Sequence, residues 1–148
     1  MNCLLTGGTG IVGSHIIFEW IHKAIVDKTV NHLFVVIRDN ELSAKQRLLN
    51  ILKDKSRPDF LNDYTLEACL EKVTVITQDL ATLTKEHIKE YDFDTVVHCA
   101  GSTSLLHTSD SKKKVHTQNY LVTKQLIQEL PQNVTRFLYI STAYSFGI

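Results

Sequence analysis

A run of glycines near the N-terminus has the composition of a loop that binds phosphate. The segment Thr6-Gly7-Gly8-Thr9-Gly10-Ile11-Val12-Gly13 directly follows a short apolar run and opens an amphipathic stretch. In such a loop Gly7 permits a tight turn, Gly10 lets a pyrophosphate approach the backbone, and Gly13 lets helix and strand pack closely. The first N–H groups of the helix then face the phosphates. The position between strand and helix favours a dinucleotide site over a purely structural glycine turn.

The residue after the second apolar run bears on which dinucleotide is bound. Arg38 comes directly after the run Leu33–Ile37, where an NAD site usually has Asp or Glu on the ribose 2′-hydroxyl. A guanidinium can instead hold the 2′-phosphate of NADP(H) through charge-assisted hydrogen bonds. Arg47 is a candidate second cation if its helix folds back over the adenosine end, and a solvated helix face is the alternative. The pattern favours NADP(H), while an NAD site with Asp39 on the ribose remains open.

The composition indicates one globular domain and argues against two classes of partner. Of 148 residues, 43% are hydrophobic and 22% charged, with 16 basic and 16 acidic side chains and a formal net charge of zero. Binding to nucleic acid or to a membrane surface would favour a cationic excess, so neither is expected. No apolar run approaches membrane-spanning length, and the N-terminus does not read as a signal peptide. The sequence therefore predicts a cytoplasmic protein.

The sequence also argues against a metal site. Cys3, Cys69 and Cys99 are odd in number and lack metal-ligand spacing, which fits a reducing compartment. His98 ends a buried apolar run and has no second ligand at metal spacing. We therefore interpret His98 as a buried packing histidine.

Short apolar runs alternate with helix-patterned segments along the whole chain, which is typical of an α/β fold. The expected strands are residues 2–5, 33–37, 73–76, 95–98 and 137–140. The expected helices are 11–26, 43–52 with Ser43 as N-cap, 66–71, 84–90 and 115–130. Crossovers of this length imply parallel strands with right-handed connections. We predict a Rossmann-type doubly wound parallel sheet with strand order 3-2-1-4-5.

Further segments match one known pattern along nearly the whole chain. Thr6–Gly13 has the spacing TGxxGxxG, and Asp79-Leu80 matches an acidic pair that follows the third strand. His98-Cys99-Ala100-Gly101 is similar to an H-x-A-A/G turn, and Asn119–Thr123 is similar to an N-V-x-G-T helix segment. These segments together resemble the extended short-chain dehydrogenase/reductase superfamily. The motifs and the resemblance imply a cofactor site made of Gly7, Thr9, Gly10, Ile11, Val12, Gly13, Arg38, Arg47, Asp79, Leu80, Ala100 and Gly101.

Three segments look most like one branch of that superfamily, the thioester reductases and fatty acyl-CoA reductases. They are Val36-Ile37-Arg38, Gln46-Arg47-Leu48 and Ser141-Thr142-Ala143-Tyr144. The resemblance implies hydride transfer from NADPH to an acyl thioester of coenzyme A or a carrier protein, giving an aldehyde or alcohol. It also implies that Thr142 stabilises the developing oxyanion. Ser141 is the alternative hydroxyl, because only one of two neighbours on a strand can face the nicotinamide.

One departure from the superfamily pattern bears on activity. The catalytic Tyr-x-x-x-Lys pair of that superfamily follows the Ser/Thr strand, and no such pair follows Thr142 in this sequence. Tyr120 and Lys124 have the spacing but precede the strand, so we interpret them as a chance pair on one helix face. We therefore predict that residues 1–148 are the NADP-binding N-terminal portion of a longer reductase. Alone, they are expected to be inactive on thioesters.

Two other functions remain open at this stage. A nucleotide-sugar epimerase or dehydratase shares these motifs, but it would normally prefer NAD and a shorter second crossover. A non-catalytic regulator that senses NADP would keep the glycine loop and discard the active site.

The fifth expected strand, residues 137–140, lies at one edge in the predicted strand order. It is apolar and carries neither proline nor an inward charge, which are the features that normally prevent edge-to-edge pairing. We therefore expect the chain to self-associate through this edge.

Overall fold

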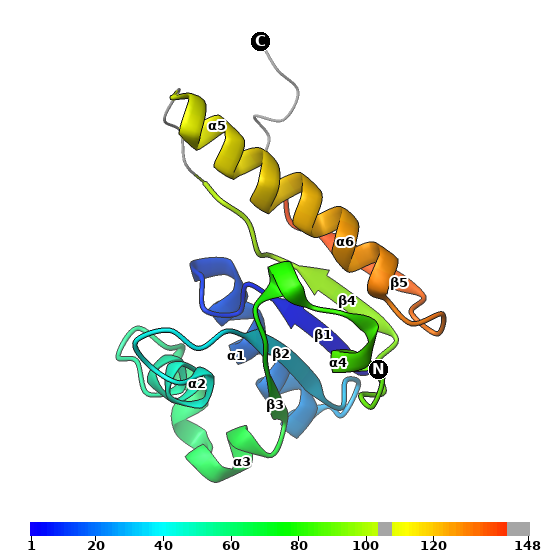
Figure 1. Ribbon diagram of the computed structural model, residues 1–148. Coiled ribbons are helices and arrows are strands. Elements are labelled where there is room, and N and C mark those ends of the chain that lie inside the picture. The colour runs from blue at the N-terminus through cyan, green and yellow to red at the C-terminus, as the bar shows by residue number, and fades with distance from the viewer. Residues whose placement is uncertain (104–107, 142–148) are drawn as a thin grey trace.

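Five parallel strands form the centre of the fold, in the order β3-β2-β1-β4-β5. They are β1 (Cys3–Thr6), β2 (Leu33–Ile37), β3 (Val73–Thr77), β4 (Thr95–His98) and β5 (Arg136–Tyr139). The computed structural model describes residues 1–103 and 108–141 of the chain (Figure 1). The predicted Rossmann-type sheet and its strand order are confirmed.

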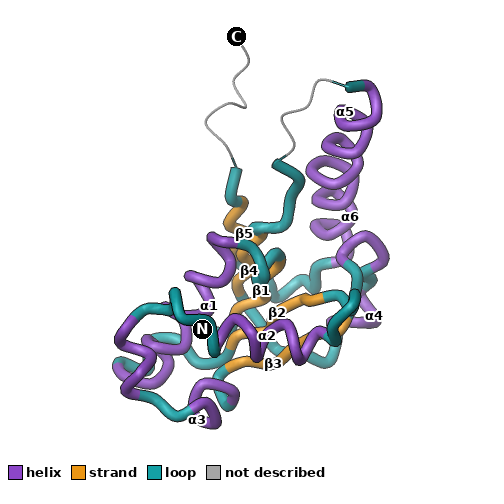
Figure 2. The backbone as a smooth tube through the Cα atoms, turned by 90° about the vertical axis from the view of Figure 1, so that its left-hand side faces the viewer, coloured by secondary structure: helices purple, strands orange, loops and turns teal. Residues whose placement is uncertain are grey.

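Helices cover both faces of the sheet. One face carries α1 (Ile11–Val26), α2 (Ala44–Leu52), the short 3-10 helix η1 (Asp59–Asp63) and α3 (Leu66–Leu70). The other carries the 3-10 helix η2 (Leu80–Thr82), α4 (Lys85–Ile88) and α6 (Val122–Glu129). Figure 2 shows α1 and α6 on opposite sides of the strands.

The two cores follow from the alternation of side chains along each strand. Cys3 and Leu5 enter the core beneath α1, whereas Leu4 between them enters the core beneath α6. Successive side chains of a strand point to opposite faces, so a strand covered on both sides reads as an unbroken apolar run. Trp20 packs into the α1 core with 8% of its surface exposed, and its indole N–H has no hydrogen-bond partner among the described residues.

The helix expected over residues 115–130 is longer and less regular than its pattern predicts. It begins as α5 (Ser109–Val115), continues through the π-helical segment η3 (His116–Leu121) and ends as α6. Thr108 caps its start, because the Thr108 hydroxyl accepts a hydrogen bond from the Ser111 N–H. In Figure 1 these elements form one continuous rod whose α5 end projects beyond the sheet.

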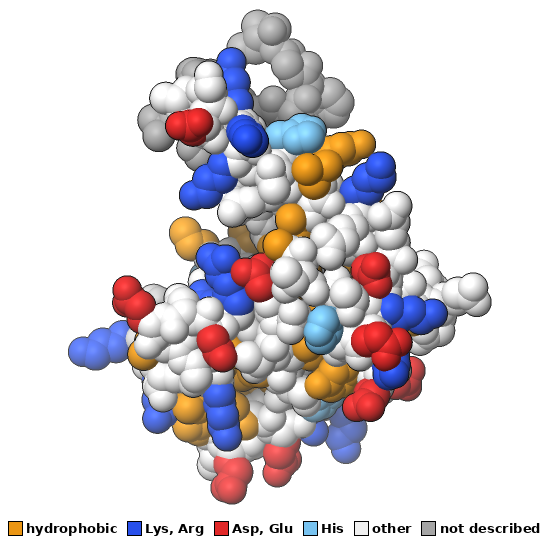
Figure 3. All heavy atoms as spheres, in the orientation of Figure 1, with side chains coloured by type: hydrophobic (Ala, Val, Ile, Leu, Met, Phe, Trp, Pro, Cys, Tyr) orange, Lys and Arg blue, Asp and Glu red, His pale blue; other side chains and the backbone are white. Residues whose placement is uncertain are grey.

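A membrane-spanning helix or a surface of one charge would point to a membrane or nucleic-acid partner. Within residues 1–103 and 108–141, no helix is long and apolar enough to span a bilayer. Basic and acidic side chains are interspersed over the face shown in Figure 3. This face therefore lacks the single-sign field that attracts a polyanion.

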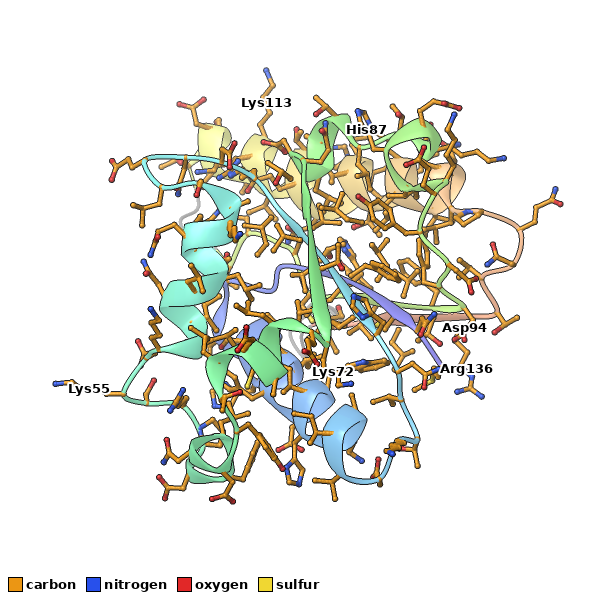
Figure 4. The ribbon with its side chains drawn as sticks, turned by 90° about the horizontal axis from the view of Figure 1, so that it is seen from below. Lys55, Lys72, His87, Asp94, Lys113 and Arg136 are labelled. Atoms are coloured by element: carbon orange, nitrogen blue, oxygen red, sulfur yellow. The ribbon has the colours of Figure 1, made fainter. Side chains whose placement is uncertain are left out.

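Strand β5 forms the edge of the sheet in the described part of the chain. It begins at Arg136, one residue earlier than expected, and Figure 4 shows Arg136 near Asp94, where β4 and β5 begin. Leu138 and Tyr139 are 48% and 44% exposed. The Arg136 N–H donates to the carbonyl of Asp94, just before β4, and the Ile140 N–H donates to the carbonyl of His98 at the end of β4. The alternation of a strand therefore directs the Tyr139 N–H towards the open edge.

We predict concentration-dependent self-association through the β5 edge, because its outward N–H and C=O groups can pair with a second copy. Tyr139→Pro should reduce association, since it removes an outward N–H and leaves the hydrogen bonds to β4 in place. Leu138→Lys should do the same through charge. Sedimentation velocity over a concentration series measures both variants. A protein that stays monomeric at high concentration contradicts the prediction.

Candidate functional site

The glycine loop connects the end of β1 to the first turn of α1. Gly7 has a φ of 72°, in the left-handed region, and a Cβ there would lie 2.5 Å from the Ala100 nitrogen. A Cβ on Gly13 would lie 2.2 Å from the Gly7 carbonyl oxygen. Both positions therefore require glycine, the first for a backbone turn against β4 and the second for the approach of helix to loop. The tight turn predicted at Gly7 is confirmed.

The N-terminus of α1 is open to an anion. Its N-cap is Gly10, which provides no side-chain cap, and no acidic residue lies in the first turn. Ile11 and Val12, which begin the helix, are 84% and 50% exposed. The N–H groups of this turn and the positive end of the helix dipole therefore face outwards without a carboxylate to neutralise them. This cradle fits a pyrophosphate.

The loop lies where the chain changes direction across the sheet. From β1 the chain moves to β2 and β3 on one side, and it then returns to β4 and β5 on the other. In open α/β sheets a dinucleotide binds in the crevice at the carboxyl ends of the strands, across such a switch point. The adenosine half is therefore expected over β2 and β3, and the nicotinamide half over β4 and β5.

An ion pair joins the ends of β2 and β3. An Arg38 Nη lies 3.2 Å from an Asp79 carboxylate oxygen, with 61% and 44% of the two side chains exposed. Asp79 also accepts a hydrogen bond from the Ala81 N–H at the start of η2. The hydrogen bond from Ala81 lowers the pKa of Asp79 most, and the hydrogen bond from Arg38 lowers it further. An exposed pair of this kind contributes about 0–1 kcal/mol, so Arg38 can leave Asp79 for a ligand at little cost.

Arg47 extends from α2 across to the glycine loop. One Nη donates to the Arg38 carbonyl oxygen at 2.8 Å, and the other donates to the Thr9 hydroxyl at 3.0 Å. Asp39, the carboxylate next to Arg38, accepts a hydrogen bond from the Ala44 N–H at 2.6 Å. Asp39 thus caps the start of α2, where a negative charge is favourable. The structure brings Arg38 and Arg47 together beside the loop.

The end of β4 is held by hydrogen bonds among polar side chains. His98 is fully buried, and its Nδ1 lies 2.6 Å from the Thr6 hydroxyl while its Nε2 lies 2.8 Å from the Thr123 hydroxyl. Burial lowers the pKa of His98 to about 4, so the ring is neutral at pH 7. Asn119 in η3 accepts a hydrogen bond from the Ser102 N–H at 2.6 Å and donates one to the Ser102 carbonyl at 3.0 Å.

These contacts were not apparent from the sequence, which indicated only packing for His98. The signal that could have revealed them is a polar residue at the end of each of two adjacent apolar strands, Thr6 on β1 and His98 on β4. The parallel register pairs these two residues directly.

Three further sets of residues that the sequence singled out lie in different places. Ala100 lies against the loop and its N–H donates to the Thr6 hydroxyl at 3.4 Å, and Gly101 lies beside Asn119. Tyr120, of the chance pair with Lys124, is 55% exposed and its ring contacts His116. Thr142 lies outside the described residues.

A sequence profile of the male sterility protein family of NAD-binding domains matches residues 5–148. The chain belongs to this family. It is thus an NAD(P)-binding domain of the extended short-chain dehydrogenase/reductase superfamily, as its motifs indicated. Curated relatives of the domain include a UDP-glucose 4-epimerase of Caenorhabditis elegans, 26% identical over 152 residues that cover 99% of this chain and 39% of the epimerase.

Two solved structures of reductase domains are similar to this domain. The thiolation-reductase di-domain of an archaeal non-ribosomal peptide synthetase superposes with a TM-score of 0.70 and 21% identity, over 97% of this chain and 36% of that one. The reductase domain of the aureusimine biosynthetic cluster superposes with a TM-score of 0.59 and 27% identity, over 96% and 33%. The chain therefore spans less than half the length of the relatives that it matches.

The two loop glycines allow a matched test. Gly7→Ala should lower the free energy of unfolding by about 1–3 kcal/mol, because it combines a left-handed φ with a clash against Ala100. Gly10→Ala should leave stability within about 0.5 kcal/mol, because its Cβ would meet nothing nearer than the Gly7 oxygen at 3.4 Å. It should still weaken dinucleotide binding, since the Cβ occupies space next to the pyrophosphate. Urea denaturation and calorimetric titration measure the two effects, and a Gly7→Ala protein of unchanged stability contradicts the argument.

The neutral, buried state of His98 predicts a pH-dependent stability. Its pKa falls from an ordinary 6.5 to about 4 on folding. The unfolded chain therefore binds more protons between these values, and stability falls as the pH falls through this range. We expect a loss of about 1–2 kcal/mol between pH 7 and pH 5 from this residue alone. Urea denaturation at both pH values should show a smaller loss in His98→Gln, and an equal loss contradicts the assignment.

Proposed function

We propose that the chain binds NADP(H) and forms the cofactor-binding part of a reductase that acts on acyl thioesters. The observation that carries the cofactor preference is the position of two arginines: Arg38 follows β2, and the Arg47 guanidinium from α2 binds the Arg38 carbonyl oxygen and the Thr9 hydroxyl. Their placement supports a site for the 2′-phosphate of the adenosine half, because two cations can share a doubly charged phosphate.

The neighbouring contacts support the same preference. Arg47 is oriented by hydrogen bonds to Thr9 and to the Arg38 backbone, so its guanidinium is held near the ribose position. Arg38 is exposed and only loosely paired with Asp79, so it can turn to a phosphate. Asp39 would be the carboxylate of an NAD site, but it is engaged by the start of α2. One oxygen of Asp39 is therefore already engaged by the backbone, which makes this carboxylate a poorer partner for a ribose 2′-hydroxyl.

The thioester substrate is supported by the family and by the crossover between β2 and β3. Residues 38–72 hold α2, η1 and α3, whereas the epimerase alternative predicts a shorter crossover. The aureusimine-cluster reductase domain, at 27% identity, supports the same choice. NADPH would supply a hydride to the thioester carbonyl carbon, and the carbon–sulfur bond would then break to leave an aldehyde and a thiolate, which takes a proton from water. Thr142 would donate a hydrogen bond to the carbonyl oxygen as it gains negative charge.

A nucleotide-sugar epimerase is the second candidate. The match to the Caenorhabditis elegans UDP-glucose 4-epimerase over 99% of this chain favours it. The two candidates differ in cofactor at the end of β2, since the epimerase reading places NAD there. Cofactor preference therefore separates them.

Arg38→Ala should lower the affinity for NADP(H) about ten- to a hundredfold, equivalent to about 1.5–3 kcal/mol, because it removes a charged hydrogen bond to the 2′-phosphate. The affinity for NAD(H), which lacks that phosphate, should change little. Calorimetric titration with both dinucleotides measures the effect. Lys45→Ala, which removes an exposed cation from the first turn of α2, is the matched control. Equal affinities of the unmutated chain for NADP(H) and NAD(H) would refute the proposed preference.

A further inference from the structure

A chain of hydrogen bonds crosses the sheet beneath the site. The Ala100 N–H lies 3.4 Å from the Thr6 hydroxyl, which lies 2.6 Å from Nδ1 of His98. On the other side of the ring, Nε2 lies 2.8 Å from the Thr123 hydroxyl. That hydroxyl donates to the Asn119 carbonyl oxygen at 2.8 Å. These hydrogen bonds thus connect the end of β1, just before the glycine loop, with the end of β4 and the segment η3.

The donor and acceptor at each step follow from the number of protons available. Thr123 has one hydroxyl proton, which it donates to Asn119, so towards His98 it acts as an acceptor. Nε2 of His98 must therefore carry a proton. Because the ring is neutral, Nδ1 is an acceptor and takes the proton of the Thr6 hydroxyl. The Thr6 oxygen in turn accepts from the Ala100 N–H.

The two ends of this series of hydrogen bonds hold the backbone that follows β4. On one side, Thr6 precedes Gly7, whose backbone touches Ala100. On the other side, the Asn119 side chain makes two hydrogen bonds with the Ser102 backbone. π-Helical turns such as η3 are rare, and those that occur are frequently at functional sites. The segment 100–102 is thus held from both sides at the end of β4, where the nicotinamide half is expected.

We propose that His98 is a positioning residue, which sets the segment 100–102 and the glycine loop at a fixed separation and so orients the nicotinamide half of the dinucleotide. The inference rests on the proposed cofactor binding. His98 is buried beneath the crevice, so it acts through Thr6 and Thr123 and does not touch the ligand. Imidazole suits this position because a rigid ring presents an acceptor and a donor on different sides.

Thr123→Val tests the proposal, because it keeps the shape of the side chain and removes the hydroxyl. We expect the affinity for NADPH to fall about tenfold, since the nicotinamide half is no longer oriented. The affinity for adenosine 2′,5′-bisphosphate, which occupies only the adenosine half, should stay within about twofold. Thr123→Ser restores the hydroxyl and should restore NADPH binding. Thr117→Val, an exposed threonine of the same π segment, is the matched control.

The outcomes separate the two levels of inference. Equal losses for NADPH and the bisphosphate in Thr123→Val indicate a merely structural role and overturn the proposal. Binding of neither ligand by the unmutated chain refutes the proposed function instead. Nitrogen-15 NMR of the histidine rings tests the hydrogen bonds from Thr6 through His98 to Thr123 without any ligand. The Nε2–H tautomer of His98 at pH 7 supports this arrangement of hydrogen bonds, and the Nδ1–H tautomer or a charged ring overturns it.

Discussion

The glycine loop and the turn after β4 touch backbone to backbone, and this contact sets the geometry around them. A side chain on Gly7 would begin 2.5 Å from the Ala100 nitrogen, so the two segments lie closer than any other residue allows. The approach follows from the parallel pairing of β1 with β4, which sets Thr6 opposite His98. Because the two strands end at the same level, α1 begins beside the turn that leads towards α5. The positive end of α1 therefore lies at the carboxyl ends of the strands, beside the backbone of the turn after β4.

The contacts at the carboxyl ends of β2 and β3 differ in kind from those at the end of β4. Over β2 and β3 the contacts are exposed and charged, as in the pair of Arg38 with Asp79. Over β4 they are buried and neutral, as in the bonds of His98 to Thr6 and Thr123. Salt screens the first kind and scarcely affects the second. Substitutions in the charged contacts over β2 and β3 are therefore expected to leave the buried hydrogen bonds at the end of β4 in place.

The sheet could be predicted from the sequence because buried apolar runs separated by long crossovers have few permitted arrangements. The turn at Gly7 could be predicted from the spacing of the glycines between the first strand and the first helix. The contact of Arg47 with Thr9 depends on how α2 tilts over the loop, which no periodic pattern encodes. The partners of His98 come from two other elements, so an examination of β4 alone indicated only packing. The long helix predicted over residues 115–130 is present, but its π-helical part was missed because those residues keep a helix-like pattern.

Trp20 is the single tryptophan of the chain, and it lies in the α1 core with its indole N–H unpartnered among the described residues. It belongs to the cluster of apolar side chains that α1 packs against the sheet. An indole in such surroundings emits at shorter wavelength than one in water, so its fluorescence distinguishes the packed core from the open chain. Trp20 is thus an intrinsic fluorescent reporter of folding, and it lies on α1, the helix that begins at the glycine loop.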